Sequence, residues 1–92
     1  MNQTVNQVIN QEVELSAVYF TGREMKTFPR RIQYGGSAIT FASGLRYLIH
    51  KGTNAIKVFD MTAGDGRTYR LRQDDNTWTL LGMRTEQEAS HA

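Results

Sequence analysis

The stretch that decides the fold is NAIKVFDMTAGDGRTYRLRQDDNTWTLLGM, residues 54–83. It contains three runs of strand-forming residues: 54–62, 67–73 and 77–83. In the middle run Tyr69 and Leu71 fall on one face of a strand, whereas Arg70 and Arg72 fall on the other. The segments between the runs are rich in Gly, Asp and Asn, which favour tight turns. The pattern predicts three consecutive antiparallel strands, with Trp78 as a core anchor of the last one.

Three further strands are expected before this meander, and they span residues 12–20, 27–34 and 37–41. Gly35 and Gly36 supply the pair of positive φ angles that a two-residue hairpin prefers. Pro29 is expected at an edge or near the start of its strand, because proline cannot donate to a strand ladder.

Residues 41–51 are compatible with two structures. As a helix, Phe41, Leu45, Leu48 and Ile49 form one apolar stripe, and Gly52 stands where helices often end. As a strand, Leu48 falls on the polar face beside its charged neighbours. We predict the helix, because it gathers the apolar side chains on one side.

The expected fold class is therefore α+β, a five- or six-stranded antiparallel sheet with one short helix near residues 41–51. At 92 residues the sheet would either close into a small SH3-like barrel or lay its apolar face on the helix. We expect a flexible N-terminal segment at 1–11, a single β-rich domain at 12–83 and a disordered tail at 84–92.

The charges are unevenly distributed along the chain. Residues 25–72 hold nine Lys and Arg against Asp60 and Asp65, a balance of +7, whereas the whole chain carries +2. A basic centre between mildly acidic ends is typical of proteins that bind acidic partners, and also of an ordinary solvated surface.

No catalytic, metal-binding or cofactor-binding motif is found. The chain lacks cysteine, and its two histidines, His50 and His91, lie far apart in sequence. Asp74 and Asp75 are adjacent in a turn, and the Gly-rich segment at 64–69 departs from the dinucleotide-binding pattern. We therefore expect no enzymatic activity, no metal and no cofactor.

Two binding functions are compatible with the sequence. The first is a module for protein–protein contact or self-association, because apolar residues such as Val18, Phe20 and Leu81 lack an obvious place in the core. The alternative is a nucleic-acid-binding module that uses the basic block 25–72. The candidate ligand-contacting residues are Arg30, Arg31, Arg46, Arg70 and Arg72. With neither a membrane-spanning stretch nor a secretory signal, we expect a cytoplasmic protein without membrane contact.

Overall fold

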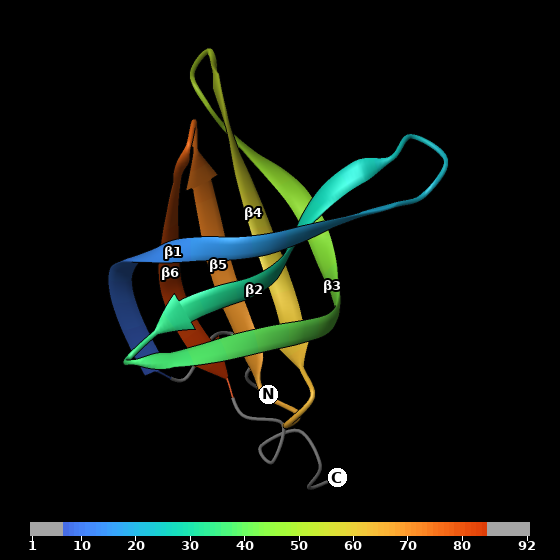
Figure 1. Ribbon diagram of the computed structural model, residues 1–92. Helices are drawn as coiled ribbons and strands as arrows, with labels where there is room; N and C mark the ends of the chain where they lie inside the picture. Colours follow the sequence, from blue (N-terminus) through green and yellow to red (C-terminus); the bar gives the residue numbers. More distant parts are fainter. Residues whose placement is uncertain (1–6, 85–92) are drawn as a thin grey trace, which may run out of the picture.

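Six antiparallel strands follow one another along the chain in this computed structural model, which describes residues 7–84 (Figure 1). The strands are β1 (Gln7–Thr21), β2 (Lys26–Tyr34), β3 (Ser37–Lys51), β4 (Asn54–Ala63), β5 (Thr68–Asp74) and β6 (Thr77–Arg84). Each strand pairs with its neighbours in sequence, and β1 pairs with β6, so the sheet closes into a barrel. Of the two arrangements that the sequence allowed, the small closed barrel is confirmed.

The predicted helix at 41–51 is wrong, and the α+β class is wrong with it. Residues 41–51 are the second part of β3, and Phe41 to Lys51 pair with Ala63 to Asn54 of β4. Two features oppose a helix here: Gly44 weakens a helix interior, and the extended chain pairs with β4 almost residue by residue from Ser43 to Lys51. Of the predicted apolar stripe, only Phe41 enters the core.

Two long strands make the corners of the barrel. The first part of β1 pairs with β6 up to Val13, and the second pairs with β2 from Glu14, with register shifts on either side of Ala17. Likewise β3 pairs first with β2 and then with β4, with a shift between Phe41 and Ser43. Such bulges bend a strand sharply, which allows six strands to close around a narrow interior.

Side chains from all six strands fill the interior. The buried apolar cluster comprises Val13, Phe28, Ile32, Phe41, Phe59, Met61, Ala63, Tyr69, Leu71, Trp78 and Leu80. The predicted alternation in the meander is confirmed, because Tyr69 and Leu71 are buried whereas Arg70 and Arg72 are not. Trp78 is the predicted core anchor and packs against Phe59, with ring centroids 5.2 Å apart.

The turns follow the expected chemistry. Gly35 and Gly36 both have positive φ, 60° and 78°, as the predicted hairpin requires. Pro29 pairs with Val18 beside a register shift, where the ladder is already interrupted.

The predicted terminal segments lie largely outside the described residues. Residues 1–6 and 85–92 are not described, residues 7–11 form the start of β1, and Arg84 ends β6. Within residues 7–84, no helix is long and apolar enough to cross a membrane.

Candidate functional site

Two hairpins project beyond the barrel at one end (Figure 1). Residues 17–31 of β1 and β2 pair mainly with each other, because β6 contacts β1 only up to Val13 and β3 contacts β2 only from Arg31. We call them the β1–β2 arm. Residues 48–57 of β3 and β4 form the β3–β4 arm, since β5 joins β4 only from Lys57. Each arm is thus a two-stranded ribbon; Phe28 and Pro29 at the base of the β1–β2 arm are buried, whereas residues 20–27 and 48–55 are exposed.

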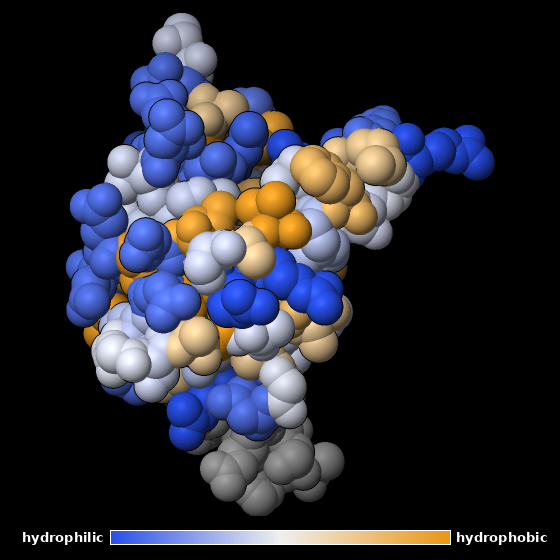
Figure 2. Space-filling model, viewed as in Figure 1, coloured by the Kyte–Doolittle hydropathy of each residue, from blue (hydrophilic) through white to orange (hydrophobic). Residues whose placement is uncertain are grey.

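Exposed apolar side chains are concentrated on these arms. Of the seven large apolar residues that are exposed in the described part of the chain, five belong to the arms. These five are Val18, Phe20, Met25, Leu48 and Ile49. In Figure 2, apolar side chains run from the middle of the barrel onto the β1–β2 arm, whose tip is hydrophilic. The sequence prediction that Val18 and Phe20 lack a core position is confirmed, since they are 43% and 58% exposed.

A basic pocket of about 310 Å³ lies at the mouth of the barrel between the arms. Lys26, Arg46 and Lys57 contribute its positive charge, and the side chain of Phe59 contributes to its wall. The carboxylate of Glu24 lies 2.9 Å from Lys26. The hydrogen bond and charge of Lys26 lower the pKa of Glu24, and the charge of Arg46 lowers it further. We call this the mouth pocket.

A larger, acidic groove of about 780 Å³ lies next to the mouth pocket along β1. Glu12 and Glu14 line it, together with the apolar residues Val13, Leu15, Val18 and Trp78. Thr27 and Gln73 line both the groove and the mouth pocket, so the two hollows adjoin. We call it the β1 groove.

The five predicted arginines do not share one surface. Arg30 and Arg31 are on β2, whereas Arg70 and Arg72 are on β5, and two strands separate β2 from β5 in either direction around the barrel. Arg46 is on β3 and lines the mouth pocket.

Each of the arginines on β2 contacts a different neighbour. The guanidinium of Arg30 lies 5.5 Å from the ring centroid of Tyr19. Arg31 donates through Nε to the hydroxyl of Thr40 at 3.4 Å. The ring of Tyr19 also stacks on Phe28, with centroids 5.5 Å apart. Two neighbours within the protein itself therefore contact this aromatic ring.

The arginines on β5 are ion-paired. Arg72 donates to Asp74 at 2.8 Å, and both side chains are more than 40% exposed. Arg70 forms two hydrogen bonds with Asp60, at 2.8 and 3.1 Å, and both side chains are less than a third exposed. Their charge is thus already balanced by carboxylates.

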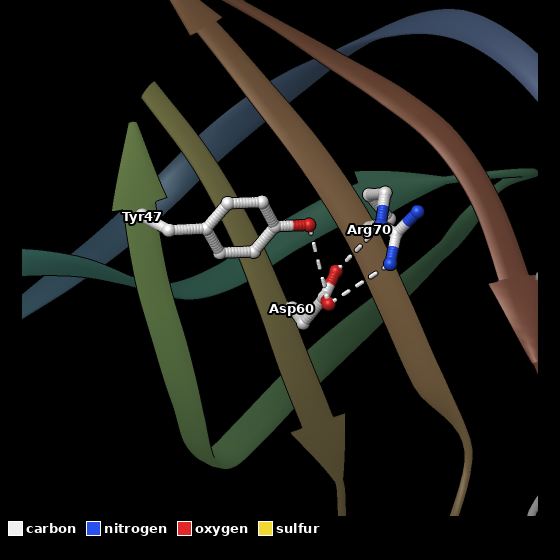
Figure 3. A network of polar contacts seen from close by, with 3 residues as sticks. All are labelled: Tyr47, Asp60 and Arg70. Carbon is white, nitrogen blue, oxygen red and sulfur yellow. Dashed lines mark hydrogen bonds and ion pairs between the residues drawn. The ribbon is translucent and has the colours of Figure 1, made fainter. Parts of the chain in front are cut away.

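A polar network around Asp60 joins three neighbouring strands (Figure 3). Tyr47 of β3 donates its hydroxyl to Asp60 of β4 at 3.4 Å, and Arg70 of β5 binds the same carboxylate. Burial and the charge of Asp60 raise the pKa of Tyr47, and the hydrogen bond to Asp60 raises that of Arg70. Both groups therefore keep their protons at neutral pH, so the network serves as a brace across the sheet.

No sequence pattern predicted the Asp60 network or the mouth pocket. The available signal was that Asp60 is the one carboxylate between Glu24 and Asp65, in a strand expected to pair with the arginine-rich strand at 67–73. Nothing in the sequence marked Lys26 and Lys57 as members of one pocket, because they come together only through the way the barrel closes.

Metal chemistry has no evident site in the described residues. Within 7–84 no three His, Cys, Asp or Glu side chains come together as a metal-binding group.

No family model, curated protein or solved structure matches the chain.

Proposed function

We propose that the protein is a non-enzymatic binding module that acts by protein–protein contact, self-association included, through its two arms. The observation that carries the proposal is that five of the seven exposed large apolar residues lie on the arms. A folded domain gains about 25 cal/mol for each Å² of apolar surface removed from water. Because these five side chains stay exposed in the folded chain, contact with an interaction partner would remove their apolar surface from water.

The charges on the arms narrow the choice of partner. The β1–β2 arm carries Arg23, Lys26, Arg30 and Arg31 against Glu24, and the β3–β4 arm carries Lys51 and Lys57. A surface that is both apolar and positively charged fits a partner with apolar side chains among carboxylates.

Nucleic-acid binding by the basic block remains the second candidate, and the mouth pocket with its three cations supports it. Two observations rank it lower. Arg70 and Arg72 are ion-paired, and Phe20 is the one aromatic side chain in the described residues that is more than a third exposed. Single-strand binders usually offer several open aromatic faces for stacking bases. A cytoplasmic location likewise stays a prediction.

Site-specific photo-crosslinking tests the proposal. A photoreactive phenylalanine analogue is placed at Phe20 on one arm, at Leu48 on the other, and at Val8 as a matched control. Val8 is 73% exposed but lies near the start of β1, away from the arms. We expect irradiation of cells that produce the protein to link the arm positions, and not position 8, to a protein.

The result that contradicts the proposal is the absence of a protein adduct at both arm positions, or equal labelling at position 8. Titration with labelled single-stranded and double-stranded oligonucleotides tests the second candidate. Binding that weakens steeply with salt would favour nucleic acid, because each phosphate contact releases about one counterion.

A further inference from the structure

Four charged side chains around the mouth pocket and the β1 groove have no ion-pair partner in residues 7–84. Two are cations of the mouth pocket, Arg46 and Lys57. The other two are carboxylates of the β1 groove, Glu12 and Glu14. The four ion pairs within this part of the chain all join other residues. Opposite charges thus lie in adjoining hollows without meeting in the same molecule.

Adjoining hollows of opposite charge form a self-complementary surface. A two-fold axis through their common boundary places the basic half of one copy over the acidic half of the other, and the reverse. The boundary is marked by Thr27 and Gln73, which line both hollows. Each charge contact is then made twice.

We propose that a second copy of this chain occupies the site, in a two-fold symmetric dimer. Glu12 and Glu14 of each copy face Arg46 and Lys57 of the other. The inference rests on the proposed function, since Val18, Met25 and Lys57 of the arms line the two hollows that the second copy would cover.

Apolar contacts by Leu15, Val18 and Met25, the apolar lining residues that are not buried, would add to the affinity of such a dimer. The β1 groove is lined by Val13, Leu15, Val18 and Trp78, and the rim toward the mouth pocket includes Met25, which is 62% exposed. Apolar groups in the middle with charges around them are the usual arrangement of a specific interface. The charges then fix the orientation of the two copies more than the strength of binding.

Three carboxylates of the same chain lie near the basic half: Glu24 forms an ion pair with Lys26 and feels the charge of Arg46, and Asp74 and Asp75 share a pocket with Lys57. Asp74 is bound to Arg72 at 2.8 Å, and no ion pair joins Asp75 to Lys57. These two aspartates leave the charge of Lys57 available to a second copy.

The test is sedimentation velocity over a range of micromolar concentrations, with four proteins. The native chain is compared with a mouth variant, Arg46→Glu with Lys57→Glu, and a groove variant, Glu12→Lys with Glu14→Lys. The control is Arg67→Glu, which reverses a charge in the turn between β4 and β5 at the other end of the barrel. Near-ultraviolet circular dichroism of Trp78 verifies that each variant is folded.

We expect the native chain and the control to dimerise, and each of the mouth and groove variants to dissociate at least about tenfold more readily, as like charges meet. Mixing the two variants is the decisive measurement. The mouth variant carries two acidic halves and the groove variant carries two basic halves. A heterodimer should therefore form from two proteins that are each monomeric alone. Its affinity should return to within about threefold of the native value, and fall between about 0.1 and 1 M salt as screening shortens from about 10 to 3 Å. If the mouth variant is misfolded, Lys57→Glu alone, at an exposed residue, replaces it.

A native chain that stays monomeric at all concentrations overturns the inference, as does a dimer that is indifferent to both charge reversals, or a mixture that stays monomeric. These outcomes are separable from a failure of the proposed function. A monomeric chain whose arm positions still crosslink to another protein refutes the dimer and leaves the binding module intact.

Discussion

Replacing Gly44 by alanine should destabilise the barrel, although the change adds only one methyl group. Gly44 lies in β3 opposite Met61 of β4. A Cβ atom at this position would overlap the thioether of Met61 and approach the backbone carbonyl oxygen of Asp60 to 2.9 Å. Met61 is fully buried, so its side chain cannot move into solvent to make room.

The size of the effect follows from two opposing terms. Inserting an extra methyl group into a packed core costs about 1–3 kcal/mol. The cost here should be near the upper end of this range, because the new Cβ atom also approaches a backbone atom too closely. Alanine restricts the unfolded chain more than glycine, which returns about 0.5–1 kcal/mol. We therefore expect the free energy of unfolding to fall by about 2 kcal/mol, which lowers the melting temperature by about 8–16 °C in a domain of this size.

Urea unfolding followed by the fluorescence of Trp78, the single tryptophan of the chain, measures the change. Gly64→Ala is the matched control, because a Cβ there meets no atom within 4 Å and φ is not positive. It should stay within about 0.5 kcal/mol of the native protein. Met61→Ala should lower the free energy of unfolding by at least about 1 kcal/mol less in the Gly44→Ala protein than in the native protein, because both changes act on the same contact. A Gly44→Ala protein as stable as the native one, or equal losses in both glycine variants, would refute the reasoning.

Four further outcomes are expected around the Asp60 network. Arg70→Gln should lower the unfolding free energy by about 1–2 kcal/mol, because it leaves a partly buried carboxylate with one weak donor, and thermal melting measures the loss. Arg72→Gln should change it by less than about 0.5 kcal/mol, since its pair with Asp74 is exposed; an equal loss in both variants would contradict the assigned burial. An absorbance titration of the native protein should show one tyrosine transition that is absent from Tyr47→Phe, and this transition should lie above the ordinary tyrosine pKa of 10.0. The free energy of unfolding should therefore fall as the pH rises past 10, because Tyr47 loses its proton first in the unfolded chain. A Tyr47 transition at or below 10.0 would contradict this. Asp60→Asn should move the Tyr47 transition back toward 10.0 by removing a negative charge, and an unchanged transition would show that burial alone raises this pKa.

The meander could be predicted because its signals are local. In residues 54–83 the alternation of side chains and the turn residues agree, so each strand is defined by its own sequence. Gly35 and Gly36 defined the first tight hairpin in the same way. These predictions required no knowledge of what lies across the barrel.

Residues 41–51 could not be assigned correctly, because their sequence satisfies two periods. The apolar residues fit a helical stripe, yet Leu45, Leu48 and Ile49 are all exposed in β3. What decides the strand is pairing with β4 along its whole length, which a window of eleven residues does not contain. The same pairing carries Leu48 and Ile49 out onto an arm.

The candidate site was predicted only in its chemistry. A basic centre and surplus apolar residues are visible in the composition, but the choice of Arg30, Arg31, Arg46, Arg70 and Arg72 assumed one common face. The structure places two of them in ion pairs with carboxylates and brings Arg46 together with Lys26 and Lys57.

The sequence by itself determined which segments of the meander are extended, where they turn, and which of their faces is buried, because these features depend on side chains a few residues apart. Only the tertiary structure decided that β1 meets β6, that the arms project, and that the groove lined by Glu12 adjoins the mouth pocket. The physical reason is closure. Two bulged strands turn the corners of the barrel, and the direction of those bends sets which distant charges become neighbours.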